Sequence, residues 1–200
     1  MIFSLSLLAG CTATEPEGPA ALVAGSGAPV IVPGGPGDAG RTATPGERLG
    51  ESEAGVTAAD VRFAEDMIPH HRQALEMAGL VEARTSSQPV RRLAERITAA
   101  QRPEIGAMTA WLRALGRTAG GHEDHTVSPE QMNELRTARG AAFDRLFLTL
   151  MIDHHEAALT MAGRQLREGS DRAMLATAKD VLSGQSTEIT RMRRLLRSGT

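Results

Sequence analysis

From residue 57 onward, hydrophobic positions recur at alternating steps of four and three residues. This spacing puts them along one face of an α-helix, as in the seam of a helical bundle. Thr57 and Ser128 are suited to N-cap positions, and Ser128 is followed by a proline at the first helical position. Gly140 is the expected break between a short separate piece and the long helix that follows it. The pattern therefore predicts four main helices, at about 57–83, 87–115, 129–167 and 170–197.

The helical part of the chain repeats itself after 84 residues. MIPHHRQALEMA at 67–78 returns as MIDHHEAALTMA at 151–162, and QRPEIGAM at 101–108 returns as QSTEITRM at 185–192. A duplicated helical hairpin explains this repeat, and two packed hairpins make an all-α, ferritin-like four-helix bundle. Pro69 belongs to the first copy alone. It removes a backbone donor and is expected to bend its helix, so the two halves are not equivalent.

The predicted seams carry polar side chains in their middle layers, where an ordinary bundle has leucine or isoleucine. The seam residues of the first hairpin are Phe63, Met67, His70, Ala74, Met77, Ile97, Gln101, Glu104, Met108 and Trp111. Those of the second hairpin are Phe147, Met151, His154, Ala158, Met161, Val181, Gln185, Glu188, Met192 and Leu195. Burying an imidazole or carboxylate without a partner costs several kcal/mol. We therefore expect a bound ion or a hydrogen-bond network to satisfy these groups.

The residues before the helical part divide into two further segments. Residues 1–11, MIFSLSLLAGC, are a short apolar run that ends in a cysteine, as in a bacterial lipoprotein signal peptide. Residues 12–56 are rich in Pro, Gly, Ala and Thr and are predicted to be a disordered tether. Residues 57–200 form the bundle domain. We predict an exported protein of the cell membrane or outer envelope, lipidated at Cys11 and held to the membrane by that lipid.

Composition excludes several classes of function. The chain has one Trp, four Phe and no Tyr, so it lacks stacking platforms for bases. Its net charge is −2 and it has no long basic stretch, which argues against nucleic acid as a partner. Cys11 is the single cysteine, and its lipidation would leave no thiol for a disulfide or a thiolate metal site. We expect the other partners to be a metal-transfer protein or a second copy of the chain.

Histidine nitrogen and methionine sulfur together suit copper, and Cu(I) favours the soft sulfur. The repeated M-x-x-H-H unit, with Met77 and Met161 behind it, is a more specific signal than a methionine stripe alone. Glu104 and Glu188 could bind the ion directly or orient a histidine. The hypothesis is copper binding, for storage, buffering or delivery outside the cytoplasm, without any need for catalysis.

Two alternatives remain open. In the first, His70 and His154 pair with Glu104 or Glu188, glutamines make the remaining bonds, and the metal-free network only fixes the register of a structural or partner-binding module. In the second, the bundle is a ferritin-like dinuclear metal oxidase. Such oxidases use more carboxylates than the two that these seams carry.

The pattern F-x-x-x-M-I-x-H-H-x-x-A-x-x-M-A occurs twice, and each copy is followed by Q-x-x-E-I-x-x-M. With it the chain resembles the bacterial family called domain of unknown function 305, over about residues 58–196. The resemblance implies an exported, ferritin-like four-helix bundle, and some family members are associated with copper binding or tolerance. Carried over by position, the implicated residues are Met67, His70, His71, Met77, Met108, Met151, His154, His155, Met161 and Met192.

Overall fold

The structure is a computed structural model of the chain, and it divides into two compact units, Met1–Glu53 and Ala54–Thr200. It describes residues 22–23, 31–32, 40–42, 48–49, 55–118 and 126–199. The predicted signal peptide and Cys11 lie outside these residues. Lipidation and the position of the anchor therefore stay predictions.

The first unit contains four short strands within the predicted tether. β1 (Leu22–Val23) pairs antiparallel with β4 (Arg48–Leu49), and β2 (Ile31–Val32) pairs antiparallel with β3 (Arg41–Thr42). Each strand has only two residues, which is below the usual length of a strand in a globular protein. The tethering role of this segment stays a prediction.

The second unit consists of five helices among its described residues. They are α1 (Ala58–Arg84), α2 (Gln88–Ala114), α3 (Pro129–Thr137), α4 (Gly140–Glu168) and α5 (Arg172–Ser198). The predicted third helix is thus two helices, as expected from Gly140, whose φ of 55° is a left-handed conformation that favours glycine. No helix in the described part of the chain is long and apolar enough to cross a membrane.

The helix boundaries follow from local capping chemistry. Thr57 caps α1 through a reciprocal capping box with Asp60, and Ser128 caps α3 in the same way with Gln131. α1 and α2 both run through a proline, Pro69 and Pro103. Each proline leaves one carbonyl of its own helix without the usual backbone donor.

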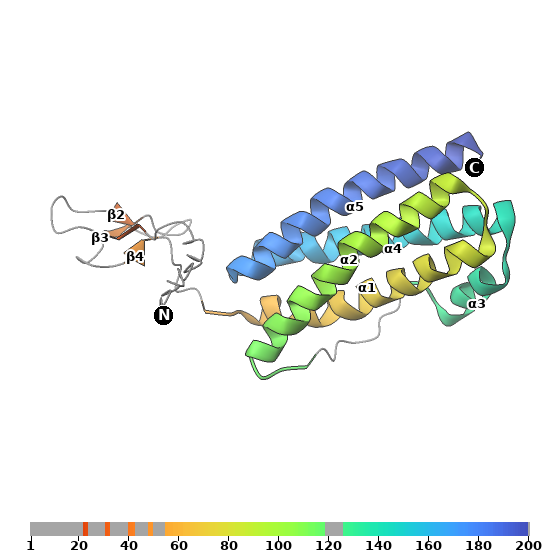
Figure 1. Cartoon of the computed structure of the whole chain (residues 1–200). Coiled ribbons are helices and arrows are strands. Elements are labelled where there is room, and N and C mark those ends of the chain that lie inside the picture. Colours follow the sequence, from red (N-terminus) through yellow and green to blue (C-terminus); the bar gives the residue numbers. More distant parts are fainter. Residues whose placement is uncertain are drawn as a thin grey trace, which may run out of the picture. The chain divides into compact units, whose positions relative to one another are not determined.

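The helices form a four-helix bundle of two hairpins, with α1 packed against α2 and α4 against α5. α1 and α4 make the main contact between the hairpins, and α2 meets α5 over a shorter length. Figure 1 shows this arrangement, with the short α3 at the end of the bundle where α1 ends and α4 begins. Gln73 of α1 fixes the segment before α3, because its amide exchanges two hydrogen bonds with the backbone of Val127 (2.8 and 3.1 Å).

A buried carboxylate ties the start of α1 to the turn between α4 and α5. Asp60 accepts hydrogen bonds from the Gln165 side-chain amide (2.5 Å) and from the backbone N–H groups of Ser170 and Asp171. Burial opposes ionisation, but hydrogen bonds from Thr57, Gln165 and Ser170 outweigh it and lower the pKa of Asp60. This contact holds one hairpin to the other at that end of the bundle.

The hydrophobic core is divided into two clusters. One contains Phe63, Met67 and Met108, and the other contains Phe147, Met151 and Met192. The members of the first cluster return in the second after a shift of 84 residues, so the repeat in the sequence is a pseudo-twofold relation in the fold.

Candidate metal centre

Two imidazoles, one from each hairpin, meet inside the bundle. His70 of α1 and His154 of α4 have ring centroids 3.6 Å apart with an interplanar angle of 31°. Both side chains are buried. All four of their ring nitrogens lack a hydrogen-bond partner. Buried polar atoms are nearly always paired, so four unpartnered nitrogens in one contact make this layer a candidate site for a bound ion.

Burial keeps these imidazoles neutral. It lowers the pKa of His70 to about 3, with a further lowering from the nearby His71 and His155. Burial also lowers the pKa of His154, well below its ordinary value, and His70 adds to the effect. The uncharged imidazole is the form that binds a metal ion, because its free lone pair is the donor.

The second histidine of each pair bonds a glutamate of its own hairpin. Nε2 of His71 lies 2.7 Å from Oε2 of Glu104, and Nε2 of His155 lies 2.7 Å from Oε2 of Glu188. The metal-free alternative paired the glutamates with His70 and His154, and that pairing is wrong. Consecutive residues on a helix point about 100° apart. His70 therefore faces the other hairpin while His71 faces α2.

The glutamates act as orienting groups in this arrangement. A hydrogen bond from one ring nitrogen to a carboxylate fixes the ring and leaves the other nitrogen free to bind an ion. The free nitrogen is Nδ1, which is buried and unpartnered in both His71 and His155. Glu104 and Glu188 were predicted either to bind directly or to orient a histidine, and the contacts favour the second role.

Gln101 and Gln185 also lie in this layer. Both are buried, and neither side-chain oxygen nor nitrogen has a partner in either residue. The metal-free alternative expected these amides to complete the histidine network, and they do not. Their seam positions were visible in the sequence. Their lack of partners depends on side-chain directions in the folded bundle, which the sequence spacing does not specify.

The candidate methionines form two groups, each drawn from both hairpins. Met67 and Met108 share a hydrophobic cluster with Met161, whereas Met151 and Met192 share the other cluster with Met77. Five of these six are buried. The repeat unit had placed Met77 and Met161 behind the histidines of their own helices. In the folded bundle each of them also shares a cluster with the methionine pair of the opposite hairpin.

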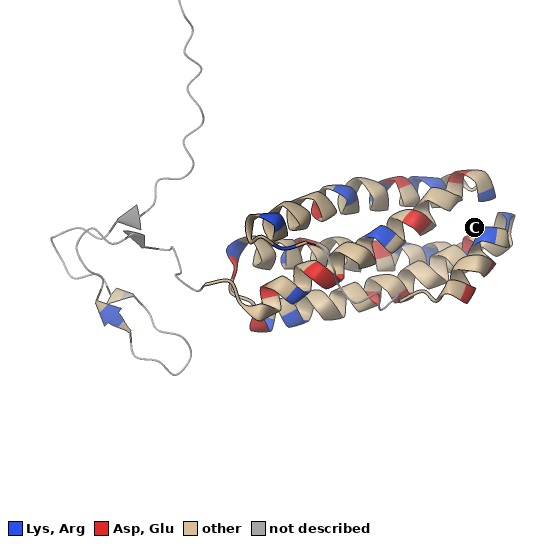
Figure 2. Cartoon of the chain, turned by 90° about the horizontal axis from the view of Figure 1, so that it is seen from below, with Lys and Arg blue, Asp and Glu red and all other residues tan. Residues whose placement is uncertain are grey.

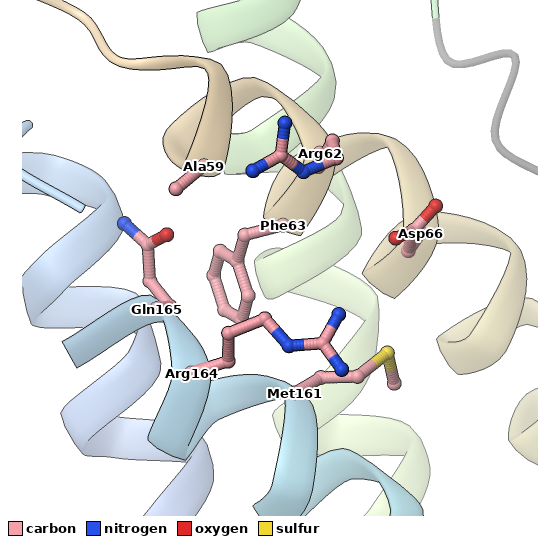
Figure 3. A pocket seen from close by; sticks show the side chains of 7 residues that line it. All are labelled: Ala59, Arg62, Phe63, Asp66, Met161, Arg164 and Gln165. Carbon is pink, nitrogen blue, oxygen red and sulfur yellow. The ribbon is translucent and has the colours of Figure 1, made fainter. Parts of the chain in front are cut away.

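Met161 is the exception among the six, because it is only half-buried. It lines a small surface pocket together with Phe63 and Arg164. Figure 3 shows the Met161 side chain beside Arg164, with Phe63 standing between them and Gln165. Its counterpart Met77 is fully buried. The two methionine groups are therefore related by the repeat but not equivalent.

The described residues contain no group of three or more His, Cys, Asp or Glu side chains that could hold a metal ion. The buried methionines of the two hydrophobic clusters are the other candidate donors close to the histidine layer along the helices. This donor set fits a soft ion such as Cu(I) and does not fit a dinuclear iron site, which requires several carboxylates.

The fold and this interior define a duplicated helical bundle with a buried layer of imidazole, amide and thioether groups. The family model of a domain of unknown function (DUF305) matches residues 60–196, and the chain belongs to this family. No curated protein matches the sequence.

Solved structures of three relatives have the same fold. A DUF305 protein from Streptomyces coelicolor, assigned as secreted, is 30% identical with a TM-score of 0.67, and the match covers 70% of this chain and 92% of that one. A DUF305 fragment from Deinococcus radiodurans is 29% identical with a TM-score of 0.66, covering 72% and 98%. CopM in its Cu(I)-bound form is 29% identical with a TM-score of 0.63, covering 70% and 96%. CopM has also been solved in Cu(II)-bound and silver-bound forms.

Proposed function

We propose that this protein binds copper, as Cu(I), in the cell envelope, where it buffers the ion or delivers it to another protein. The observation that carries this proposal is the His70–His154 contact, in which all four ring nitrogens are buried and unpartnered. Buried thioethers in both adjoining clusters supply soft donors. The bundle's likeness to CopM, which has been solved with copper and silver, supports the same assignment.

Each group has a distinct role in this proposal. His70 and His154 supply neutral nitrogen donors, while the Nδ1 atoms of His71 and His155 are the next available donors. Glu104 and Glu188 orient those two rings. The Met67–Met108–Met161 and Met151–Met192–Met77 groups supply sulfur and favour the monovalent ion. Bound Cu(I) would act as a soft acceptor that these donors satisfy, and no step of catalysis is required.

The location belongs to the proposal as well. We infer that the protein is exported and that a lipid on Cys11 holds it to the membrane, with the segment before the bundle as a tether. Support comes from the apolar run that ends at Cys11 and from the secreted assignment of the Streptomyces relative. Labelling cells with a fatty-acid analogue tests it. The Cys11→Ser variant should lose both the label and the membrane fraction.

A copper titration tests the binding itself. The purified Cys11→Ser protein, which has no thiol, is titrated with Cu(I) under reducing conditions against a competing chelator, with Zn(II) and Fe(II) as controls. We expect stoichiometric binding that is selective for Cu(I). The His70→Ala/His154→Ala variant should lose more affinity than the roughly 10–100-fold typical of an outer partner. Its far-UV circular dichroism should remain helical. Unchanged binding by this variant would refute the assignment.

The methionines are tested by a matched pair of variants. Met67→Leu/Met151→Leu removes two buried thioethers next to the histidine layer and keeps the hydrophobic volume. Met132→Leu/Met174→Leu does the same at two buried methionines that belong to the same two clusters but lie outside the candidate set and away from the histidine positions in sequence. We expect Cu(I) affinity to fall in the first variant and to stay at the wild-type level in the second. Equal effects would mean that methionine contributes only to packing.

The metal-free structural module is the second candidate function. It is favoured by the His71–Glu104 and His155–Glu188 contacts, which satisfy one nitrogen in each ring without any ion. If no ion binds above the competitor, the polar layer serves to fix the packing register. The bundle surface would then be the expected binding site for a protein partner.

A further inference from the structure

The two His–Glu pairs are equivalent in geometry but lie under different surfaces. His71–Glu104 and His155–Glu188 are related by the 84-residue repeat and have the same 2.7 Å contact. Each glutamate is partly exposed, so each pair joins the buried histidine layer to the solvent. The exposed fraction is 22% for Glu104 and 13% for Glu188. Either pair could therefore serve as a route for an ion between solvent and interior.

Basic side chains surround the Glu188 end. Arg92 and Arg96 lie one turn apart on α2, and Glu188 and Arg191 lie one turn apart on α5. Arg96 is close to Arg191 and Glu188: burial and the arginines lower its pKa, while Glu188 and Glu95 act in the opposite direction. Arg92, Arg96 and Arg191 are all exposed. In the described part of the chain, none of the three guanidinium groups forms an ion pair. We call these three residues the arginine cluster.

The arginine cluster has no counterpart at the Glu104 end. The positions that correspond to Arg92, Arg96 and Arg191 are Ala176, Asp180 and Ala107. Because α2 and α5 are exchanged by the pseudo-twofold, the repeat predicts that Asp180 has the place beside Glu104 that Arg96 has beside Glu188. Asp180 is exposed on α5. We call Glu104 and Asp180 the acidic mouth.

One neighbouring pair of positions reduces the charge difference between the two ends but does not cancel it. Glu95 beside the arginine cluster corresponds to Lys179 beside the acidic mouth. Over these four corresponding positions the Glu188 end carries a formal charge of +2, and the Glu104 end is neutral. Acidic and basic residues are otherwise interspersed along the helices, as Figure 2 shows. The charge difference is therefore confined to the acidic mouth and the Glu188 end, and it does not extend over a whole face of the bundle.

Polar groups lead inward from the acidic mouth. Glu104 bonds His71, and the buried Gln101 lies almost one helical turn earlier on α2 with both polar atoms unpartnered. Pro103 immediately precedes Glu104, and its missing N–H weakens the helix there. The second copy has Thr187 at that position. The Glu188 end has the equivalent polar groups, His155 and Gln185, so Pro103 is the feature that distinguishes the Glu104 end along this path.

We propose that metal cations enter and leave the buried histidine layer through the acidic mouth formed by Glu104 and Asp180, and that the arginine cluster repels them from the Glu188 end. This proposal rests on the proposed function, because it needs an ion that binds inside the bundle. Local charge changes the rate at which a charged ligand arrives more than it changes final affinity. The acidic mouth therefore predicts a kinetic difference between the two ends.

Stopped-flow capture of Ag(I), a redox-stable soft monovalent ion, tests this route in the Cys11→Ser protein at low ionic strength. Asp180→Lys makes the acidic mouth basic, and Arg96→Asp gives the Glu188 end the residue found at the other mouth. We expect Asp180→Lys to slow association by up to about tenfold and Arg96→Asp to accelerate it. Equilibrium affinity should change less, and both rate effects should shrink in 0.5 M salt.

Matched controls separate the mouth from overall charge. Glu134→Lys on α3 and Arg145→Asp on α4 make the same charge changes at exposed positions outside both mouths. The route is refuted if wild-type protein binds Ag(I) and the mouth variants have the rates of their controls. If wild-type protein binds neither Ag(I) nor Cu(I), the proposed function fails and the route fails with it. Circular dichroism and thermal melting establish that each variant is folded.

Discussion

Neutral histidines at positions 70 and 154 make the metal-free protein sensitive to mild acid. Their pKa values are lower in the folded state than in the unfolded state, where the ordinary value is about 6.5. As the pH falls below about 6.5, the unfolded chain therefore binds protons that the folded chain does not. Stability is retained above that pH and is lost by about 1.4 kcal/mol per pH unit for each such histidine.

Urea unfolding at pH 7.5 and 5.5, with a chelator present, measures this loss. We expect the wild type to lose on the order of 2 kcal/mol between these two pH values. His154→Leu leaves one of the two histidines and should show about half the pH dependence. If the wild type and His154→Leu have the same pH dependence, the buried pair does not account for the acid sensitivity.

At the scale of elements, the turn between α4 and α5 depends on close packing at Gly169. A methyl group there would lie 2.1 Å from Nε2 of Gln165 and 2.6 Å from Oδ1 of Asp60. Gly169→Ala therefore pushes apart the contact that ties α1 to the α4–α5 turn. We expect it to lower the free energy of unfolding by about 1–3 kcal/mol, as overpacking does elsewhere.

Gly184 provides the matched control for this substitution. It lies within α5, and an added methyl group would meet nothing within 4 Å. Gly184→Ala should raise stability by about 0.5–1 kcal/mol, because alanine favours a helix over glycine. Urea unfolding of both variants decides the matter. A Gly169→Ala protein as stable as the wild type would show that the Asp60 contact adapts without cost.

At the scale of the whole molecule, each hairpin depends on the other to cover its interior face. α1 and α4 make the main contact between hairpins, and the His70–His154 contact lies between these two helices. The pseudo-twofold relation implies that a second copy of one hairpin can take the place of the other. Residues 139–200, expressed alone, should therefore form a dimer with His154 of one copy facing His154 of its partner.

Analytical ultracentrifugation with circular dichroism tests this prediction. We expect a helical dimer that unfolds on dilution, because folding and association are coupled in such a fragment. Replacing His154 by Lys places two charges at the centre of that dimer and should prevent its formation. A hairpin that is folded and monomeric at all concentrations would contradict the view that the two halves complete one core.

Much of the bundle could be predicted from local patterns. Steps of four and three residues, the Thr57 and Ser128 caps and Gly140 predict helices whose bounds agree with the structure to within a few residues. Helical periodicity and capping depend on neighbours in the chain, so they are visible in the sequence. The 84-residue repeat likewise predicts two hairpins and their related seams.

Helical spacing and the repeat were enough to predict that imidazole, amide and thioether groups would lie inside a duplicated bundle. Which of these groups contact one another became clear from the folded bundle. His70 meets His154 of the other hairpin while His71 meets Glu104 of its own, and Met161 joins Met67 and Met108 rather than the methionines of its own hairpin. These outcomes depend on the rotation of each helix about its axis and on packing between residues far apart in the chain. Spacing along one helix sets which side chains share a face, but contacts between helices set what that face meets.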